Sequence, residues 1–147
     1  MTELRQLTQN DFDSIKDLFY KVFTGAPWFD DWSDDARLTA YITDLTGNRN
    51  SLAYGFYEDG ELVGISLGSI RHWFSGTEYN IDELCILTER QGRGLGKAFV
   101  SAIEEAVRAR GIPRIFLQTD TAMPAYEFYK KLGFTELTTP VSFNKDL

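Results

Sequence analysis

A glycine-rich stretch in the second half of the chain constrains the fold more than any other feature. The stretch Gln91-Gly92-Arg93-Gly94-Leu95-Gly96 separates a predicted strand from a predicted long helix. Glycines let the backbone approach a ligand closely, because no Cβ atom intervenes. The first turn of a helix also presents unpaired N–H groups and the positive end of the helix dipole, which together stabilise an anion. The stretch therefore predicts a phosphate-binding loop, with an ordinary glycine turn before a helix as the alternative.

Two common nucleotide-binding motifs do not fit this loop. A P-loop needs glycine five residues before Gly96 and Ser or Thr after Lys97, but the chain has Gln91 and Ala98 at those positions. A dinucleotide-binding fingerprint needs a third glycine where the chain has Lys97. Arg93 and Lys97 add positive charge to the loop. The sequence therefore does not predict either of these two classes of nucleotide site.

Hydrophobic periodicity predicts an alternation of strands and helices along the 147 residues. Strands are expected at 4–7, 51–57, 62–70, 78–87 and 115–119, with one or two more within 134–143. Helices are expected at 12–23, from Ser33 to Gly47, and at 94–110 and 124–132. The order β-αα-βββ-αβ-αβ predicts an α/β fold, with helices on both faces of a mixed sheet, in a single domain spanning residues 1–147.

Short local signals fix some of these boundaries. Thr8, with Asp11 three residues later, matches an N-cap with an acidic third residue. Asp59-Gly60, between two predicted strands, is a strong hairpin signal. The residues from Arg71 to Thr77 are expected to form a loop.

The composition is that of a globular protein and argues against several classes of function. Hydrophobic residues make up 43% and charged residues 25% of the chain. A net charge of −7 argues against nucleic acid binding, because phosphate contacts require a surplus of Lys and Arg. No stretch reaches the ~20 apolar residues of a membrane span, and the N-terminus has no apolar signal-peptide core. Cys85 is the only cysteine, so no intrachain disulfide or cysteine-based metal site is expected. We expect a cytoplasmic protein without membrane or nucleic acid partners.

The loop and its surroundings resemble the GNAT superfamily of N-acetyltransferases. The pattern Gln91…Gly94-Leu95-Gly96 is similar to the coenzyme A pyrophosphate loop of that superfamily. The strand before the loop, the helix after it and the segment 125–134 follow in the same order as in the superfamily. The resemblance covers essentially the whole chain and is most specific from Ile81 to Phe134. It implies a central, mostly antiparallel sheet, acetyl-CoA as cosubstrate, no metal, and transfer of the acetyl group to an amine.

The resemblance also implies which residues hold the cosubstrate. In the superfamily, the strand before the loop splays from its neighbour, and its free backbone groups pair with the pantetheine arm. Here that part of the strand is Leu84, Cys85 and Ile86. The residues expected around the pyrophosphate are Gln91, Gly92, Arg93, Gly94, Leu95, Gly96 and Lys97.

Acetyl transfer to an amine needs a base, because an alkyl ammonium has a pKa near ~10 and must first lose a proton. Side chains alternate along a strand, so Asp82 is expected to share one face with Leu84, and Ile81 and Glu83 the other. The stretch from Ile81 to Leu84 is also similar to that of some aminoglycoside 6′-N-acetyltransferases, in which an aspartate at this point is the proposed base. Asp82 is therefore the predicted base. Glu83 is the alternative, because a bulge in this strand would shift the faces.

The departing thiolate needs a proton donor. Tyr129, on the predicted helix 124–132, matches the superfamily tyrosine whose hydroxyl points at the coenzyme sulfur. A phenol with a pKa near ~10 can protonate a thiolate. Tyr129 also has the helical spacing of a core residue, which is the alternative to a catalytic role. Tyr126 is a second candidate for the donor.

The connection 25–35 concentrates aromatic and acidic side chains, and the resemblance implies that it lines the acceptor site. Trp28 and Trp32 can stack on a sugar or an amine-bearing chain, while carboxylates can hold ammonium groups. Asp120 matches an aspartate that contacts substrate in aminoglycoside enzymes. The alternatives are a hydrophobic anchor for the two tryptophans and a turn or N-cap for Asp120.

Together these residues predict an N-acetyltransferase that acts on a small, cationic primary amine, such as an aminoglycoside or a polyamine. Three alternatives stay open: acetylation of a peptide or protein amine, a coenzyme A-binding module without catalysis, and a small-molecule binder unrelated to coenzyme A. The sequence also leaves a homodimer open.

Overall fold

The computed structural model describes residues 1–147 and contains one five-stranded sheet. The strands lie in the order β1-β2-β3-β4-β5. Their bounds are Thr2–Leu7 for β1, Ser51–Glu58 for β2, Glu61–Trp73 for β3, Gly76–Ile86 for β4 and Arg114–Leu117 for β5. The first four strands pair antiparallel, and β5 pairs parallel to β4. This arrangement confirms the predicted mixed, mostly antiparallel sheet.

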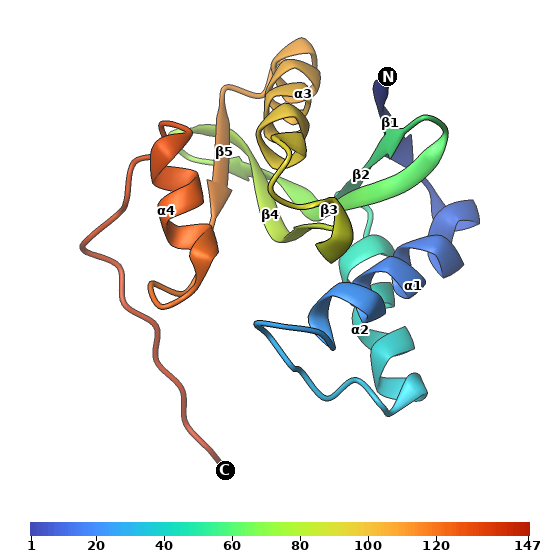
Figure 1. The fold of residues 1–147 in the computed structure, drawn as a ribbon. Coiled ribbons are helices and arrows are strands. Elements are labelled where there is room, and N and C mark those ends of the chain that lie inside the picture. Colours follow the sequence, from blue (N-terminus) through green and yellow to red (C-terminus); the bar gives the residue numbers. More distant parts are fainter.

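Helices cover both faces of the sheet (Figure 1). Their bounds are Phe12–Phe23 for α1, Asp35–Thr46 for α2, Leu95–Ala109 for α3 and Pro124–Lys131 for α4. Phe99 of α3 faces Gly64 on one side of β3, whereas Tyr41 of α2 bonds Glu83, the partner of Leu67. Gly64 and Leu67 are three residues apart and therefore lie on opposite faces of the strand. The α/β fold expected from the sequence is confirmed.

The two predicted local signals form as expected. The Thr8 hydroxyl accepts a bond from the Asn10 N–H at 3.3 Å, and the Asp11 carboxylate accepts one from the Thr8 N–H at 2.8 Å. This capping box opens the short 3-10 turn Gln9–Asp11 that leads into α1. Asp59 and Gly60 have φ values of 50° and 84° and form the turn between β2 and β3.

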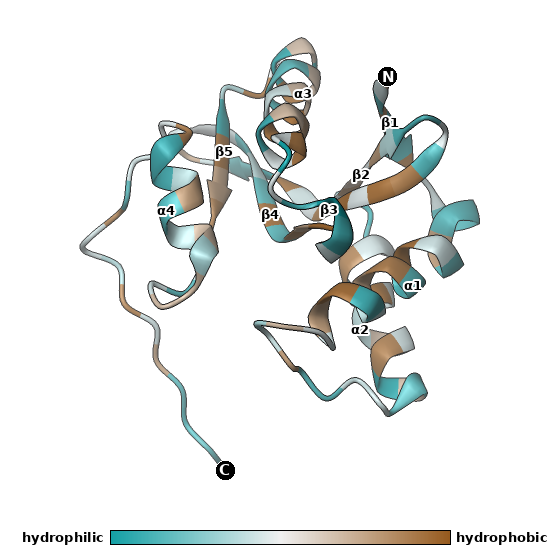
Figure 2. Cartoon of the chain, in the orientation of Figure 1, coloured by the Kyte–Doolittle hydropathy of each residue, from teal (hydrophilic) through white to brown (hydrophobic).

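The core consists of 25 buried residues between the sheet and its helices. Hydrophobic segments gather in the central strands and on the helix faces that lie against them (Figure 2). Burial of apolar surface on both faces of β3 ties the two helix layers to one sheet.

None of the helices in this structure has both the length and the apolar character needed to cross a bilayer.

The predicted loop from Arg71 to Thr77 is wrong. Strand β3 continues to Trp73 and β4 begins at Gly76, so the two strands form a tight hairpin in which Trp73 pairs with Gly76. Arg71, His72 and Trp73 are exposed. The ladder therefore extends beyond the core, where hydrophobic alternation no longer marks a strand.

The strands expected within 134–143 are absent from the structure. The chain after α4 runs away from the body without joining the sheet (Figure 1). Leu137, Val141 and Phe143 are exposed. Pro140 lacks the N–H that a strand ladder needs, which disfavours pairing of this segment with the sheet.

Strand β4 contains a β-bulge at Asp82. Glu83 pairs with Leu67 and Ile81 with Gly68, the next residue of β3, so Asp82 has no partner of its own. An extra residue in one strand interrupts the alternation of side chains, so residues before and after the bulge no longer follow one alternating pattern. The bulge that the sequence left open as an alternative is therefore present.

The bulge corrects the predicted faces of β4. Ile81 was expected beside Glu83, but their partners Gly68 and Leu67 are neighbours in β3 and point to opposite faces. Ile81 therefore shares its face with Leu84, on the side of α3, whereas Glu83 points toward α2.

We predict that Gly68→Ala destabilises the protein by about 3 kcal/mol, because overpacking with no room to relax carries a cost of this size. A Cβ atom at Gly68 would lie 2.2 Å from the Asn80 carbonyl oxygen, which belongs to the backbone beside the bulge. Gly25→Ala is the control, because its Cβ would make only ordinary contacts at 3.5 and 3.6 Å. Urea denaturation measures both, and an equal, small loss for the two variants would contradict the prediction.

Candidate active site

The parallel pairing of β4 with β5 stops halfway along β4. The last paired residues are Ile81 and Leu117, whereas β4 continues to Ile86. The edge of β4 beyond Ile81 therefore has no strand beside it, and α4 follows beyond the end of β5 (Figure 1). Free N–H and C=O groups along such an edge can pair with an extended ligand. The predicted pantetheine residues Leu84, Cys85 and Ile86 lie on this stretch.

The glycine-rich loop follows directly. Gly92 and Gly94 have φ values of 78° and 79°, a region that favours glycine, and a Cβ atom on either would meet nothing within 4 Å. The Gln91 side-chain amide donates to the Ile86 carbonyl oxygen at 3.0 Å and ties the loop to the end of β4. Phe128 of α4 lies 3.1 Å from the Cβ position of Gly96, so this glycine permits the contact between α3 and α4.

The N-terminus of α3 has no side-chain cap. By contrast, α2 is capped by Asp34, whose carboxylate accepts from the Arg37 N–H at 3.2 Å. The first N–H groups of α3 therefore point out of the helix without a partner from the chain, at the positive end of its dipole. The geometry suits an anion such as a diphosphate.

The cations near the loop are already engaged in part. Arg93 contacts Glu58 at 2.7 Å, and Arg90 contacts both Glu58 and Glu61, the latter at 2.5 Å. Lys97 is exposed on the first turn of α3. The positive charge expected from Arg93 is therefore partly neutralised by the Glu58 carboxylate of the β2–β3 hairpin.

Glu83 is partly buried where β4 leaves β5. Its carboxylate accepts a hydrogen bond from the Tyr41 hydroxyl at 2.7 Å. Burial raises the pKa of the Glu83 carboxyl above its ordinary value; the Tyr41 bond acts in the opposite direction, and the nearby Asp82 and Asp30 raise it further. A carboxyl group with a raised pKa is better matched to accepting a proton at neutral pH.

Asp82 lies in a different environment. It is exposed on the bulge, and its carboxylate accepts a bond from the Asn80 side-chain amide at 3.0 Å. The structure therefore brings Asp82 and Glu83 to the same point of β4, with Glu83 turned inward and Asp82 in solvent.

Tyr129 lies on α4, packed between the rings of Phe128 and Phe134 at centroid distances of 5.2 and 5.3 Å. Burial raises the pKa of the Tyr129 hydroxyl, and electrostatic interactions with Cys85 and Glu83 raise it further. Tyr129 is therefore close enough to the free part of β4 to interact with it electrostatically, and its hydroxyl keeps its proton. Cys85 itself is buried, and burial raises the pKa of its thiol.

The two predicted acceptor tryptophans pack against the core. The ring of Trp28 lies 5.4 Å from that of Phe23, and Trp32 stacks on Tyr41 at 5.3 Å with an interplanar angle of 16°. The Trp32 indole N–H is buried and has no partner. Within the chain, both tryptophans therefore make the contacts of a hydrophobic anchor, which was the alternative to stacking on a substrate.

Several acids of the connection 25–35 serve the fold. Asp34 caps α2, Asp35 pairs with Lys16 at 2.6 Å, and Asp31 accepts from the Ser33 hydroxyl at 2.6 Å. Asp30 differs, because it is exposed and acts on Glu83 through its charge. Asp30, Asp82 and Glu83 thus form a small cluster of carboxylates, called here the acidic cluster.

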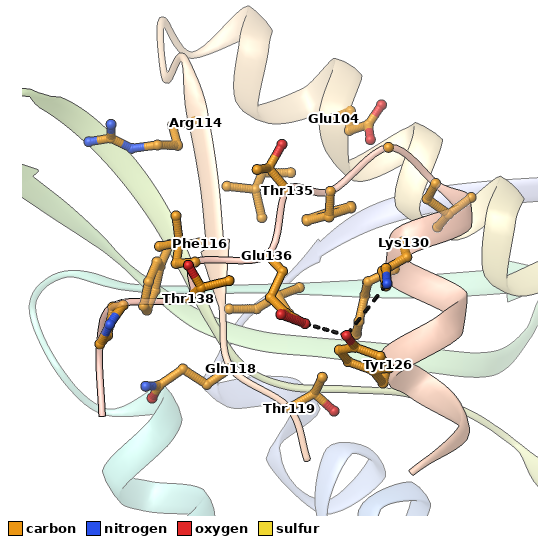
Figure 3. Close-up of a pocket in the computed structure, with 18 of the residues that line it drawn as sticks. Glu104, Arg114, Phe116, Gln118, Thr119, Tyr126, Lys130, Thr135, Glu136 and Thr138 are labelled. Atoms are coloured by element: carbon orange, nitrogen blue, oxygen red, sulfur yellow. Dashed lines mark hydrogen bonds between the residues drawn. The ribbon is translucent and has the colours of Figure 1, made fainter. Parts of the chain in front are cut away.

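A hollow of about 1140 Å³ lies between β5, α4 and the last part of the chain (Figure 3). Asp120 and Tyr129 are among the residues that line it. Across it, the Tyr126 hydroxyl donates to Glu136, and Lys130 contacts the same hydroxyl at 3.5 Å. The Asp120 carboxylate accepts a hydrogen bond from the Ala122 N–H at 2.8 Å. This bond is typical of a turn, the alternative that the sequence offered to a substrate contact. The hollow does not include the predicted tryptophans or the acidic cluster.

One residue of the site escaped the sequence analysis. Tyr41 lies within the helix expected from Ser33 to Gly47, and its hydroxyl is the direct partner of Glu83. The available signal was chemical: a tyrosine on the buried face of a helix needs a partner for its hydroxyl.

Comparisons with known proteins identify the family of the chain. The model of the acetyltransferase (GNAT) family matches residues 12–134. The acetyltransferase ECA0875 of Pectobacterium atrosepticum is 26% identical over 129 residues, which cover 85% of this chain and 84% of that protein.

Solved structures with this fold include aminoglycoside acetyltransferases. The enzyme HMB0005 from an uncultured soil metagenomic sample is 26% identical, with a TM-score of 0.73 and coverage of 99% of both chains. The enzyme AAC(6')-Iy in complex with the bisubstrate analogue CoA-S-monomethyl-acetylneamine has a TM-score of 0.74 at 19% identity, with coverage of 100% of this chain and 99% of that one.

Proposed function

The chain belongs to the GNAT family of acetyltransferases, and from this membership we propose that it moves an acetyl group from acetyl-CoA directly to a primary amine of a small, cationic molecule. The single observation that carries the proposal is the position of the Glu83 carboxylate. It lies where β4 leaves β5, and it interacts electrostatically with Tyr129 on α4. A base and an acid thus flank the open edge of β4, where a thioester would lie.

The residues present fit acetyl-CoA as cosubstrate. The uncapped N-terminus of α3 and the open space at Gly92 and Gly94 suit a diphosphate. The free edge of β4 from Leu84 to Ile86 suits the two amides of a pantetheine arm, which pair like an added strand. A backbone N–H on this edge would stabilise the oxyanion that forms when the amine attacks the thioester carbonyl.

Glu83 is the base that the geometry favours. It is turned toward the protein interior beside the open edge, and burial raises its pKa toward the range of a useful base. Asp82, the base favoured by the sequence, is exposed on the bulge. In this assignment Glu83 accepts the proton of the ammonium, directly or through water, and Asp82 contributes negative charge that attracts the amine.

Tyr129 is the proposed acid. When the tetrahedral adduct collapses, the carbon–sulfur bond breaks and the sulfur leaves as a thiolate. The Tyr129 hydroxyl, which keeps its proton in this partly buried position, donates it to that sulfur. The tyrosine is then reprotonated from solvent.

The acidic cluster favours a cationic acceptor. Asp30, Asp82 and Glu83 carry no Lys or Arg partner, so an ammonium group would find three carboxylates around the transfer site. The aminoglycoside acetyltransferases among the structural neighbours support an amino sugar as one candidate acceptor, and a polyamine is another. A homodimer and a cytoplasmic location belong to the same proposal.

We predict that Glu83→Gln lowers kcat/KM at least ~10²-fold, as expected for loss of a proton-transfer group. Asp82→Asn, the matched control on the neighbouring residue, should lower kcat/KM much less and mainly raise KM, because it removes only attraction. Steady-state assays with neamine and spermidine measure both variants. The reverse ranking would return the role of base to Asp82.

The pH profile tests the same assignment. The base must be deprotonated, so kcat/KM rises with pH as Glu83 loses its proton. Because burial raises the pKa of Glu83, this rise should lie at higher pH than for an ordinary carboxyl group, and it should disappear in Glu83→Gln.

We predict that Gly94→Ala weakens acetyl-CoA binding at least ~10-fold, a change of about 1.4 kcal/mol, because its Cβ enters the space expected for the diphosphate. Gly111→Ala is a close control. Its φ of 78° matches the 79° of Gly94, its Cβ also meets nothing within 4 Å, and it lies beyond the other end of α3. Both variants should lose similar stability, since both place a side chain at positive φ. Calorimetric titration that finds equal affinities would remove the loop from the acetyl-CoA site.

We predict that Tyr129→Phe leaves acetyl-CoA affinity unchanged and lowers kcat by ~10²–10⁴-fold, because the ring still packs while the proton donor is lost. Tyr126→Phe, one turn away on the same helix, is the control and should leave kcat close to that of the parent, because its hydroxyl is bonded to Glu136. Unchanged turnover in Tyr129→Phe would make Tyr129 a packing residue only.

A further inference from the structure

We propose that Tyr41 is a positioning residue, which holds the Glu83 carboxylate in the orientation that receives the acceptor's proton. This inference rests on the proposed function of Glu83 and deepens it. The direct observation is the hydrogen bond from the Tyr41 hydroxyl to the Glu83 carboxylate at 2.7 Å, which joins α2 to β4 across 42 positions of sequence.

The ring of Tyr41 is fixed on two sides. Trp32 stacks on it at 5.3 Å and 16°, and Phe19 meets it edge-on at 5.8 Å and 61°. Phe19 and Trp32 also touch each other edge-on at 5.5 Å, so the three rings form a closed cluster. Aromatic contacts of these geometries are favourable beyond the area they bury. The hydroxyl therefore projects from a ring that has little freedom to turn away.

The hydroxyl acts as a constant donor. Burial raises the pKa of Tyr41, and its bond to Glu83 and the charges of Glu83 and Asp82 raise it further, so it does not ionise near neutral pH. A neutral tyrosine hydroxyl donates a stronger hydrogen bond to an ionised carboxylate than to a protonated carboxyl group. The bond thus favours the charged form of Glu83, which is the form a base requires.

The other groups that face Glu83 act in the opposite sense. Asp82 on the same strand and Asp30 in the connection before α2 both disfavour its negative charge. Cys85 and Tyr129 also lie within electrostatic range, and both keep their protons. Tyr41 is therefore the one neighbour of Glu83 whose interaction stabilises the carboxylate.

The test is Tyr41→Phe, which keeps the ring stacked on Trp32 and removes only the hydroxyl. Carboxyl ¹³C NMR titration, with the Glu83 signal assigned by its loss in Glu83→Gln, should show the midpoint of Glu83 moving to higher pH. The acidic limb of kcat/KM for neamine or spermidine should move in the same direction. On that limb we expect a loss of about tenfold, the scale of one hydrogen bond to a charged group. Tyr20→Phe is the control, because Tyr20 is an exposed tyrosine on α1, and it should shift neither the Glu83 midpoint nor the acidic limb.

A double-mutant cycle separates positioning from plain stabilisation. If Tyr41 acts through Glu83, adding Tyr41→Phe to Glu83→Gln should change kcat/KM by less than about twofold, because the partner charge is already gone. An unmoved Glu83 midpoint, or the same loss at every pH in both backgrounds, would overturn the inference. The proposed function fails separately, if Glu83→Gln alone leaves turnover intact.

Discussion

The backbones of β3 and β4 approach each other so closely at Gly68 that no side chain fits between them. A Cβ atom there would lie 2.2 Å from the Asn80 carbonyl oxygen. This approach accompanies the register shift that leaves Asp82 without a partner and turns Glu83 toward α2. The direction in which the inward carboxylate points, its burial and its bond to Tyr41 all follow from one position that only glycine can occupy.

A second consequence of the strand geometry is the open edge of β4. A parallel pair stays together only where both strands continue, and β5 has four residues. Beyond Leu117 the chain turns away into α4, which carries Tyr129. The same departure that costs β4 a partner thus leaves backbone groups available to a ligand.

The sequence predicts local and periodic features well, because their physical causes lie within a few residues of one another. The capping box of Thr8 and Asp11, the turn at Asp59-Gly60 and the glycine loop before α3 all belong to this class. The hairpin at Trp73 and the segment after Gly133 do not. The tip of the hairpin is exposed and lies beyond the core, and the apolar residues Leu137, Val141 and Phe143 are exposed without joining the sheet. The bulge at Asp82 depends on the neighbouring strand, and the Tyr41–Glu83 bond joins positions 42 residues apart. Such pairings depend on tertiary packing, which short-range patterns do not encode.

The burial of Cys85 has a practical consequence for following the reaction. It is the only cysteine of the chain, it is 7% exposed, and burial raises the pKa of its thiol. Thiol reagents attack thiolates, so a buried, protonated cysteine reacts slowly with them. Each acetyl transfer would release one free coenzyme A thiol into solution. A chromogenic disulfide could therefore record turnover continuously against a low background from the protein itself.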